Sequence, residues 1–336
     1  MTPSPAPRTR GAAPHVAVVG AGIVGAAIAW SLARRGAHVT VLERADAAAT
    51  GSTGRSAAGL RHQFSLRANV RFSRFSAERF AAFAAEVGTD AGFRRVGYLF
   101  LVPPCQEARW AEDRAMQRAE GVRVEHWSLA DLARRAPYVA GDGLAEASFG
   151  PDDGVLDPHA ATLGYLAAAR ALGAAVRFGS AVVGLRPRAG GWRVATAAGE
   201  LAVDHVVNAA GPQAGAVAAL AGARLPVVAS RRDVFVTAPV AGLPLPTPLV
   251  VDVATGVWWR SEGERLLLGR SNPAEAPGLW HAAGFSGHGV QHAPATGAAV
   301  AERVLTGGDA GFDLRPFDPA RFAHAAPANT AEARVV

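Results

Sequence analysis

The chain has 336 residues, of which 50% are hydrophobic and 18% are charged, and this globular composition excludes a disordered or fibrous protein. The formal net charge is +6, but the arginines are scattered and form no nucleic-acid-binding motif, so we expect no nucleic-acid partner. All 34 residues in the lysine-plus-arginine count are arginine, which excludes a lysine Schiff base and the usual pyridoxal-phosphate chemistry.

Cysteine content and apolar runs indicate the compartment. Cys105 is the single cysteine, so an internal disulfide and a cysteine-based metal cluster are both excluded. The spacing of His281, His288 and His292 fits no zinc motif, and we predict no metal site. The longest apolar runs fall well short of the ~20 residues of a membrane span. Residues 1–14 lack the apolar region of a secretory signal, so we predict a disordered tail there, a cytoplasmic protein and no transmembrane segment.

The first elements indicate a parallel sheet. His15–Gly20 is a β-branched run that predicts a buried strand, Ile23–Arg35 predicts a helix, and Ala37–Leu42 predicts a second strand. A strand, a helix and a strand in so short a segment are typical of a βαβ unit.

Further helices and strands follow a polar, glycine-containing loop over residues 48–64. Phenylalanines at helical spacing predict an amphipathic helix over Ala68–Val87. Beyond it we predict a strand over Arg95–Val102 and a helix over Glu107–Glu120. A turn-rich junction over Phe149–Asp157 and a helix over Pro158–Leu172 follow.

The second half is rich in β-strand patterns. A first set of strands is predicted at Ala175–Phe178, Ala181–Arg186, Trp192–Ala197 and Ala202–Ala209. A second set is predicted at Val234–Thr237, Leu249–Val253, Val257–Arg260 and Arg265–Leu268, with hairpin turns at Thr255-Gly256 and Glu262-Gly263. The last elements are a strand at Leu279–Ala283, a glycine loop and a helix from about Pro294 to Leu305, before an irregular tail.

A glycine motif at the first strand–helix turn indicates a dinucleotide site. Residues 20–25 read GAGIVG, a GxGxxG in the order strand, turn, helix. Gly20 permits the tight turn, Gly22 lets the backbone approach a pyrophosphate, and Gly25 lets the helix pack on the strand. The backbone of Ile23 and Val24 begins the helix, whose positive end attracts phosphate.

An acidic residue ends the second strand, where it can bind ribose hydroxyls. Glu43 stands there, followed by Arg44, and its carboxylate would repel the 2′-phosphate of NADP. NAD and FAD share this pattern, so both cofactors remain open at this point. A glycine-rich turn without a ligand is the third alternative.

Three further segments resemble the FAD-dependent amine and amino-acid oxidoreductases, the D-amino-acid oxidase-like family. Residues 51–64, GSTGRSAAGLRHQF, resemble the flavin loop of that family. Residues 206–212, VVNAAGP, look like its second FAD strand, and residues 284–289, GFSGHG, look like its closing flavin motif. The sarcosine oxidase β-subunit, dimethylglycine dehydrogenase and glycine oxidase groups are the most similar.

The resemblance implies an α/β fold in which a Rossmann-like FAD-binding domain is interleaved with an antiparallel-sheet substrate domain. The FAD-binding domain would comprise residues 15–94, 150–225 and 279–308. The substrate domain would comprise residues 95–149 and 226–278, with an irregular tail over 309–336.

The resemblance also implies FAD as the cofactor. In addition to the glycine turn, Glu43 and Arg44, the residues that match the family's cofactor motifs are Ser52, Thr53, Gly54, Arg55, Ala210, Gly211, Gly284, Gly287, His288, Gly289, Val290 and Gln291. Gln291 stands where oxidases of the family commonly carry a lysine.

The implied reaction is oxidation of the C–N bond of a small amine, an amino acid or an N-methyl amino acid by hydride transfer to flavin N5. Because oxygen activation in relatives uses a fixed cation near N5 and lysine is absent here, we expect a dehydrogenase rather than a fast oxidase.

Arg61, His62 and Arg260 are the candidate catalytic residues. Arg61 matches the family arginine on the substrate side of the flavin, where its planar fork suits a carboxylate, and a structural salt bridge is the alternative. His62 could tune the flavin or act as a base, or be a structural histidine. Arg260 could be the carboxylate clamp instead.

One segment of the family is missing from this sequence. Only nine residues, 270–278, separate the last substrate-domain strand from the predicted strand at Leu279, where the family carries a longer segment that covers the flavin. The alternative function is therefore a non-catalytic or partner-dependent flavoprotein: a subunit, a scaffold or a degenerate homologue. A heteromeric partner subunit could supply the lost surface, and an electron acceptor is a further possible partner.

Overall fold

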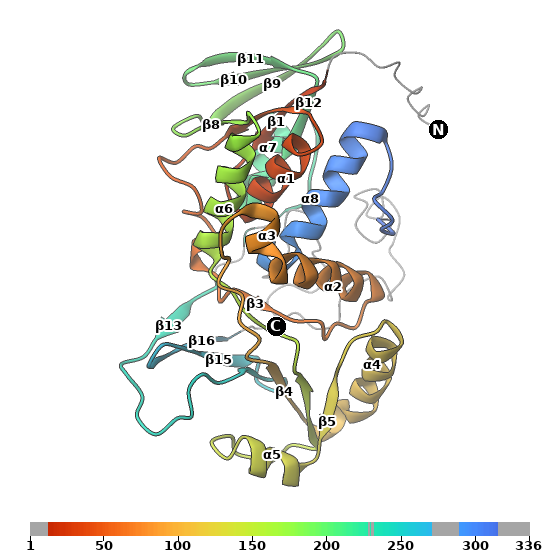
Figure 1. Ribbon diagram of the computed structural model, residues 1–336, viewed down its shortest axis with the longest axis vertical. Helices are drawn as coiled ribbons and strands as arrows, with labels where there is room; N and C mark the ends of the chain where they lie inside the picture. Colours follow the sequence, from red (N-terminus) through yellow and green to blue (C-terminus); the bar gives the residue numbers. More distant parts are fainter. Residues whose placement is uncertain (1–12, 228, 230–231, 271–288, 315–336) are drawn as a thin grey trace.

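A parallel sheet and a larger mixed sheet organise the chain (Figure 1). The computed structural model describes residues 13–227, 229, 232–270 and 289–314. The parallel sheet has the strand order β12-β1-β2-β8, and every neighbouring pair in it is parallel. Its strands are His205–Asn208, His15–Val19, His38–Leu42 and Ala175–Arg177, in that order.

Helix α1 (Ile23–Ala33) joins β1 to β2 and confirms the predicted βαβ unit. Nine of its residues are buried because it packs against α6 (Pro158–Ala171) and α8 (Gly289–Thr306). A helix that is apolar on all sides must be buried by neighbouring elements, as α1 is by these two helices. The positive end of α1 therefore lies at the carboxyl edge of the parallel sheet.

A three-stranded antiparallel sheet lies beside this layer and corrects one predicted strand. It consists of β9 (Val182–Arg188), β10 (Gly191–Thr196) and β11 (Gly199–Val203). The predicted single strand over Ala202–Ala209 is wrong, because the chain leaves this sheet at Asp204 and continues as β12. The carboxylate of Asp204 accepts a hydrogen bond from the backbone N–H of His15 (2.8 Å), which directs the chain to β1.

The larger sheet combines two distant parts of the sequence, in the order β13-β16-β15-β14-β4-β6-β5. Its strands in that order are Val234–Val236, Arg265–Arg270, Val257–Glu262, Leu249–Asp252, Tyr98–Val102, Glu146–Gly150 and Glu125–Trp127. The pair β4–β14 is parallel and the other pairs are antiparallel. Both predicted hairpin turns are confirmed by the antiparallel pairing of β14, β15 and β16.

Several short elements were not predicted. They are β5 and β6 of the large sheet, α5 (Leu129–Arg135), α7 (Ala214–Ala219) and β7 (Gly154–Val155). The last of these pairs with β3 (Gly59–Leu60). In Figure 1, β3 lies between the parallel sheet and the large sheet. The predicted helix α4 (Glu107–Ala119) is present and covers one face of the large sheet through Trp110.

The predicted helix over Ala68–Val87 is wrong as a single helix. Helix α2 (Arg67–Ala81) ends at Ala81, and α3 (Phe83–Val87) begins after the single residue Ala82. The break lets the buried Phe83 ring meet Tyr165 of α6 edge-on, with 4.8 Å between ring centroids.

The last helix begins earlier than predicted. Helix α8 starts at Gly289, so Pro294 lies inside it rather than at its first turn. The residues before Pro294, from Val290 to Ala293, are buried against the rest of the protein, and this packing offsets the hydrogen bond that proline cannot donate. The predicted strand Leu279–Ala283 and the predicted site residues Gly284, Gly287 and His288 lie outside the described residues. Within the described ranges, no helix is both long and apolar enough to cross a membrane.

Candidate functional site

The glycine turn presents a bare helix end at the carboxyl edge of the parallel sheet. Gly22 caps α1 without a side-chain hydrogen bond, and the first turn of the helix has no acidic residue. A Cβ at Gly22 would meet only Thr53 Oγ1, at 3.1 Å, so space lies next to this residue. Gly20 and Gly25 serve packing, because a Cβ on them would lie 2.5 Å from Ala209 O and 2.0 Å from Gly20 O, respectively.

Glu43 is held in place beside this helix end. Its carboxylate accepts hydrogen bonds from the backbone N–H groups of Ala21 (2.7 Å) and Ala45 (2.9 Å). A carboxylate has about four acceptor positions, so two remain for the hydroxyls of a ribose. The neighbouring Arg44 is exposed to solvent.

The loop after β2 returns to the same helix end. The hydroxyl of Thr53 accepts a hydrogen bond from the N–H of Ile23, the first residue of α1 (3.2 Å). Thr53–Arg55 forms a short 3-10 turn in which Ser52 and Arg55 are exposed. Gly54 is required by packing, since a Cβ there would lie 2.4 Å from Ala49 O and 2.6 Å from His159 Nε2.

The end of β12 lies directly against the glycine turn, since Ala209 is the residue that a Cβ on Gly20 would meet. The side chain of Asn208 accepts a hydrogen bond from Ala210 N–H (3.2 Å) and donates one to Ala214 O (2.8 Å), which holds the turn after the strand. Gly211 has a φ of +54°, and a Cβ on it would meet nothing within 4 Å. Four chain segments thus adjoin the start of α1 and offer backbone donors, a carboxylate and little side-chain bulk.

Gln291 lies in the first turn of α8 and is 1% exposed. Its Oε1 accepts the backbone N–H of Arg61 (2.9 Å), which fixes the orientation of the amide. Its Nε2 is buried and has no hydrogen-bond partner within the described part of the chain. A buried donor without a partner costs free energy, so this nitrogen fits an acceptor on a bound group. The donor set as a whole, a bare helix end, a ribose-type carboxylate and this amide, fits FAD.

Arg61 and Arg260 come together around Tyr98. The guanidinium of Arg61 is buried among aromatic rings, 4.5 Å from the centroid of Phe64 and 5.9 Å from that of Tyr98. Arg260 reaches from β15 to the loop after β2, where its Nε donates to Ala57 O (2.8 Å). Burial raises the pKa of Tyr98 to about 12, while the charges of both arginines act in the opposite direction. Tyr98 therefore remains a protonated phenol at neutral pH.

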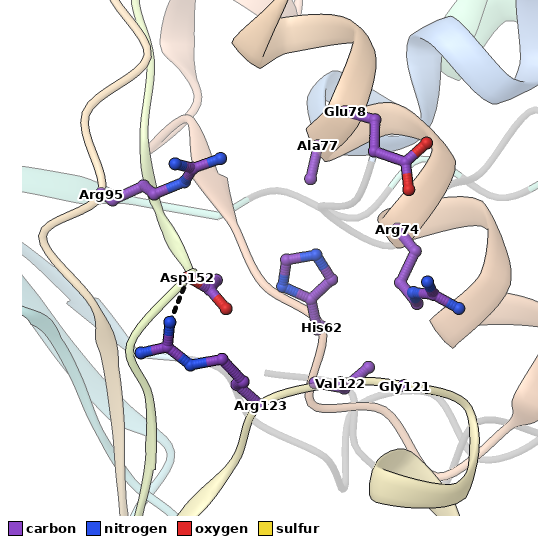
Figure 2. A pocket seen from close by; sticks show the side chains of 9 residues that line it. All are labelled: His62, Arg74, Ala77, Glu78, Arg95, Gly121, Val122, Arg123 and Asp152. Carbon is purple, nitrogen blue, oxygen red and sulfur yellow. Dashed lines mark ion pairs between the residues drawn. The ribbon is translucent and has the colours of Figure 1, made fainter.

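The neighbouring His62 faces a different set of side chains. Its Nδ1 lies 2.5 Å from Oδ1 of the buried Asp153, and its backbone N–H donates to the same oxygen (2.9 Å). The ring lines a cavity of about 230 Å³ beside α2, shown in Figure 2. The predicted catalytic residues thus divide into two groups, one at Tyr98 and one at this cavity.

Sequence reasoning missed Tyr98 and Asp153. Tyr98 lies in a strand that was predicted, but its closeness to two arginines from distant segments exists only in the folded chain. Asp153 lies in the turn-rich junction, where the sequence Asp152-Asp153-Gly154 was the available signal. Within the described residues, no group of three or more histidine, cysteine or carboxylate side chains is placed to hold a metal ion.

Comparison with known proteins gives a family. The family described as DAO, FAD dependent oxidoreductase, matches residues 15–275. FAD-dependent oxidoreductase domain-containing protein 1 from Bos taurus is 29% identical, over 91% of this chain and 84% of its own length. That alignment runs over 413 positions, more than the 336 residues of this chain, so the relative carries residues without a counterpart here.

Two further relatives have named substrates. Mitochondrial dimethylglycine dehydrogenase from Mus musculus is 28% identical over 75% of this chain, which corresponds to 30% of that protein. Among solved structures, L-proline dehydrogenase from P. horikoshii superposes with a TM-score of 0.79 at 25% identity, over 93% of this chain and 98% of the other.

Proposed function

The chain belongs to the DAO family of FAD-dependent oxidoreductases, and from this premise we propose that it oxidises the C–N bond of a small amino acid or N-methyl amino acid. The family decides between the two cofactors that the glycine motif left open, in favour of FAD. The observation that carries the proposed substrate class is the pair of buried arginines, Arg61 and Arg260, beside the phenol of Tyr98.

The chain's own residues supply binding and orientation. The bare end of α1 would hold the pyrophosphate, Glu43 the ribose, and Gln291 Nε2 an acceptor of the ring system. When bound, FAD supplies the acceptor for the hydrogen and the two electrons that leave the substrate carbon. The guanidinium of Arg61 would bind the substrate carboxylate, since a planar fork suits two carboxylate oxygens. Arg260, whose Nη1 pairs with Glu262 and whose Nε donates to Ala57 O, would add its positive charge next to Tyr98.

The aromatic surroundings would exclude water from this site. Phe64 and Phe100 are fully buried, and their rings lie 4.5 and 5.1 Å from the guanidinium carbon of Arg61. In such a low-dielectric site a charged pair interacts more strongly than in water. The protonated Tyr98 hydroxyl can donate a hydrogen bond to a carboxylate or an amine nitrogen there.

Anaerobic titration of the FAD-loaded protein tests the proposal. We expect loss of the oxidised flavin absorbance with at least one of sarcosine, N,N-dimethylglycine, proline and glycine, and no loss with methylamine, which has no carboxylate. Tyr98→Phe keeps the ring but loses the hydroxyl, and should slow flavin reduction by about tenfold or more. Tyr138→Phe, on the opposite face of the same sheet, is the control. No bleaching by any compound would reject the oxidation of amino acids.

We propose a dehydrogenase rather than a fast oxidase because the sequence contains no lysine. The reduced protein should react slowly with oxygen and faster with an artificial acceptor. Stopped-flow mixing of the photoreduced protein with aerated buffer measures this directly, and fast reoxidation would contradict the proposal.

A partner-dependent or non-catalytic flavoprotein is the second candidate. Edge strand β13 leaves Phe235 and Val236 60% and 58% exposed, and the bovine relative carries additional residues. A protein that binds FAD stoichiometrically but is never bleached would favour this candidate.

A further inference from the structure

His62 and three arginines line a cavity beside α2, and none of the residues assigned to FAD is among its lining residues. Arg74, Arg95 and Arg123 contribute the positive charges, and Glu78 and Asp152 the negative ones. Figure 2 shows the His62 ring in the middle of this group, with Arg95 on one side of it and Arg74 on the other.

The charges of this cavity are not balanced. Arg123 pairs with Asp152, with 3.5 Å between the nitrogen and the oxygen. Arg74 donates a hydrogen bond to the backbone carbonyl of Glu120, and this carbonyl group carries no net charge. The exposed Arg95 forms no ion pair within the described part of the chain. Two guanidiniums therefore face the space against the single carboxylate of Glu78.

The histidine is fixed by a buried carboxylate. Asp153 is 1% exposed, accepts from His62 through Oδ1, and accepts from Gln63 Nε2 through Oδ2 (3.3 Å). Gly150 makes room for it, because a Cβ there would lie 2.1 Å from Asp153 Oδ2. A buried carboxylate that holds one imidazole nitrogen fixes the ring and leaves Nε2 to face the cavity.

We propose that this cavity is a binding site for a small oxyanion, a carboxylate or a phosphate group, distinct from the FAD site. Arg95 and Arg74 would pair with the anion, as guanidinium groups do with both chemistries. His62, which Asp153 holds through Nδ1, would line the centre of the site. The cavity volume of about 230 Å³ admits a ligand of a few heavy atoms and excludes a dinucleotide.

Calorimetric titration of the FAD-loaded protein with inorganic phosphate, acetate and succinate, at constant ionic strength, tests this proposal. We expect saturable binding of at least one of these ions, and the comparison of the three separates a phosphate from a carboxylate site. Arg95→Gln should weaken that binding by about tenfold or more, since it removes a charged partner. Arg94→Gln, which changes the adjacent exposed arginine outside the cavity, should leave it unchanged.

Two results would overturn the site: the absence of saturable binding of all three ions, or equal weakening by Arg94→Gln and Arg95→Gln. A second measurement excludes displacement from the FAD site. The flavin spectrum should remain unchanged at saturating anion, and release of FAD on titration would show that the ions bind at the FAD site instead.

Discussion

Single residues at the candidate site show how burial sets protonation. His292 follows Gln291 in α8 and is enclosed by Phe64 and Phe72, with Ser73 Oγ 3.1 Å from its Nε2. Burial, followed by the charge of Arg61, lowers the pKa of His292 from 6.5 to about 3. The imidazole is therefore neutral in the folded protein across the physiological range.

The lowered pKa of His292 predicts a pH-dependent stability. Below pH 6.5 the unfolded chain binds a proton that the folded chain does not accept until about pH 3. The stability from this residue is complete above pH 6.5 and is lost as the pH falls, by about 1.4 kcal/mol per pH unit. Urea unfolding at pH 7 and pH 5 should show a smaller difference in His292→Gln than in the wild type. Equal differences would contradict this account.

The residue scale is also where sequence reasoning is weakest. The glycine motif and Glu43 were predicted because each acts within a short local segment. Arg61, Tyr98 and Arg260 meet only because β3, β4 and β15 pack together, and no spacing along the chain encodes that meeting. The sequence also left the role of His62 open, because its partner Asp153 lies on a distant segment of the chain.

At the scale of elements, local patterns predicted most of the helices and strands, and tertiary packing explains the errors. The break at Ala82 and the early start of α8 both serve the burial of side chains against distant helices. One missed helix did have a local signal. Ser128 and Asp131 form a reciprocal capping box at the start of α5, and that Ser-x-x-Asp spacing is readable in the sequence.

A buried ion pair joins α4 to the large sheet. Arg114 and Glu146 are 6% and 2% exposed, and Arg114 donates two hydrogen bonds to the Glu146 carboxylate, which also contacts His126 (2.8 Å). Arg114→Leu should destabilise the protein by about 3–5 kcal/mol, because it removes the guanidinium that neutralises a buried carboxylate. The double variant Arg114→Leu/Glu146→Leu should recover much of this loss.

An exposed pair provides the control for this measurement. Arg193 and Glu200 join β10 to β11 at 2.9 Å, with side chains that are 57% and 48% exposed. Arg193→Leu should cost about 1 kcal/mol or less in chemical denaturation. Similar losses for Arg114→Leu and Arg193→Leu would contradict the role assigned to the buried pair.

At the scale of the whole molecule, two sheets from interleaved segments meet at β3 and β7. The FAD residues lie at the edge of the parallel sheet, and Tyr98 and Arg260 belong to the large sheet. The interleaving followed from the order of the patterns along the sequence. The shortened segment before Leu279 could be predicted only from the family resemblance.

The account depends on the bare end of α1 holding a pyrophosphate, and the ratio of FAD to protein measures this most directly. The purified wild type should carry about one FAD per chain by its absorbance spectrum. Gly22→Asn and Gly22→Asp differ only in charge, and both side chains cap a helix well. We expect a folded protein in both cases. The affinity for FAD should fall in the asparagine variant, because a side chain at this position stands where the backbone approaches the pyrophosphate, and should fall further in the aspartate variant, whose charge repels phosphate. Wild-type affinity for FAD in the aspartate variant, or a well-folded wild type that is colourless and refuses added FAD, would contradict the account.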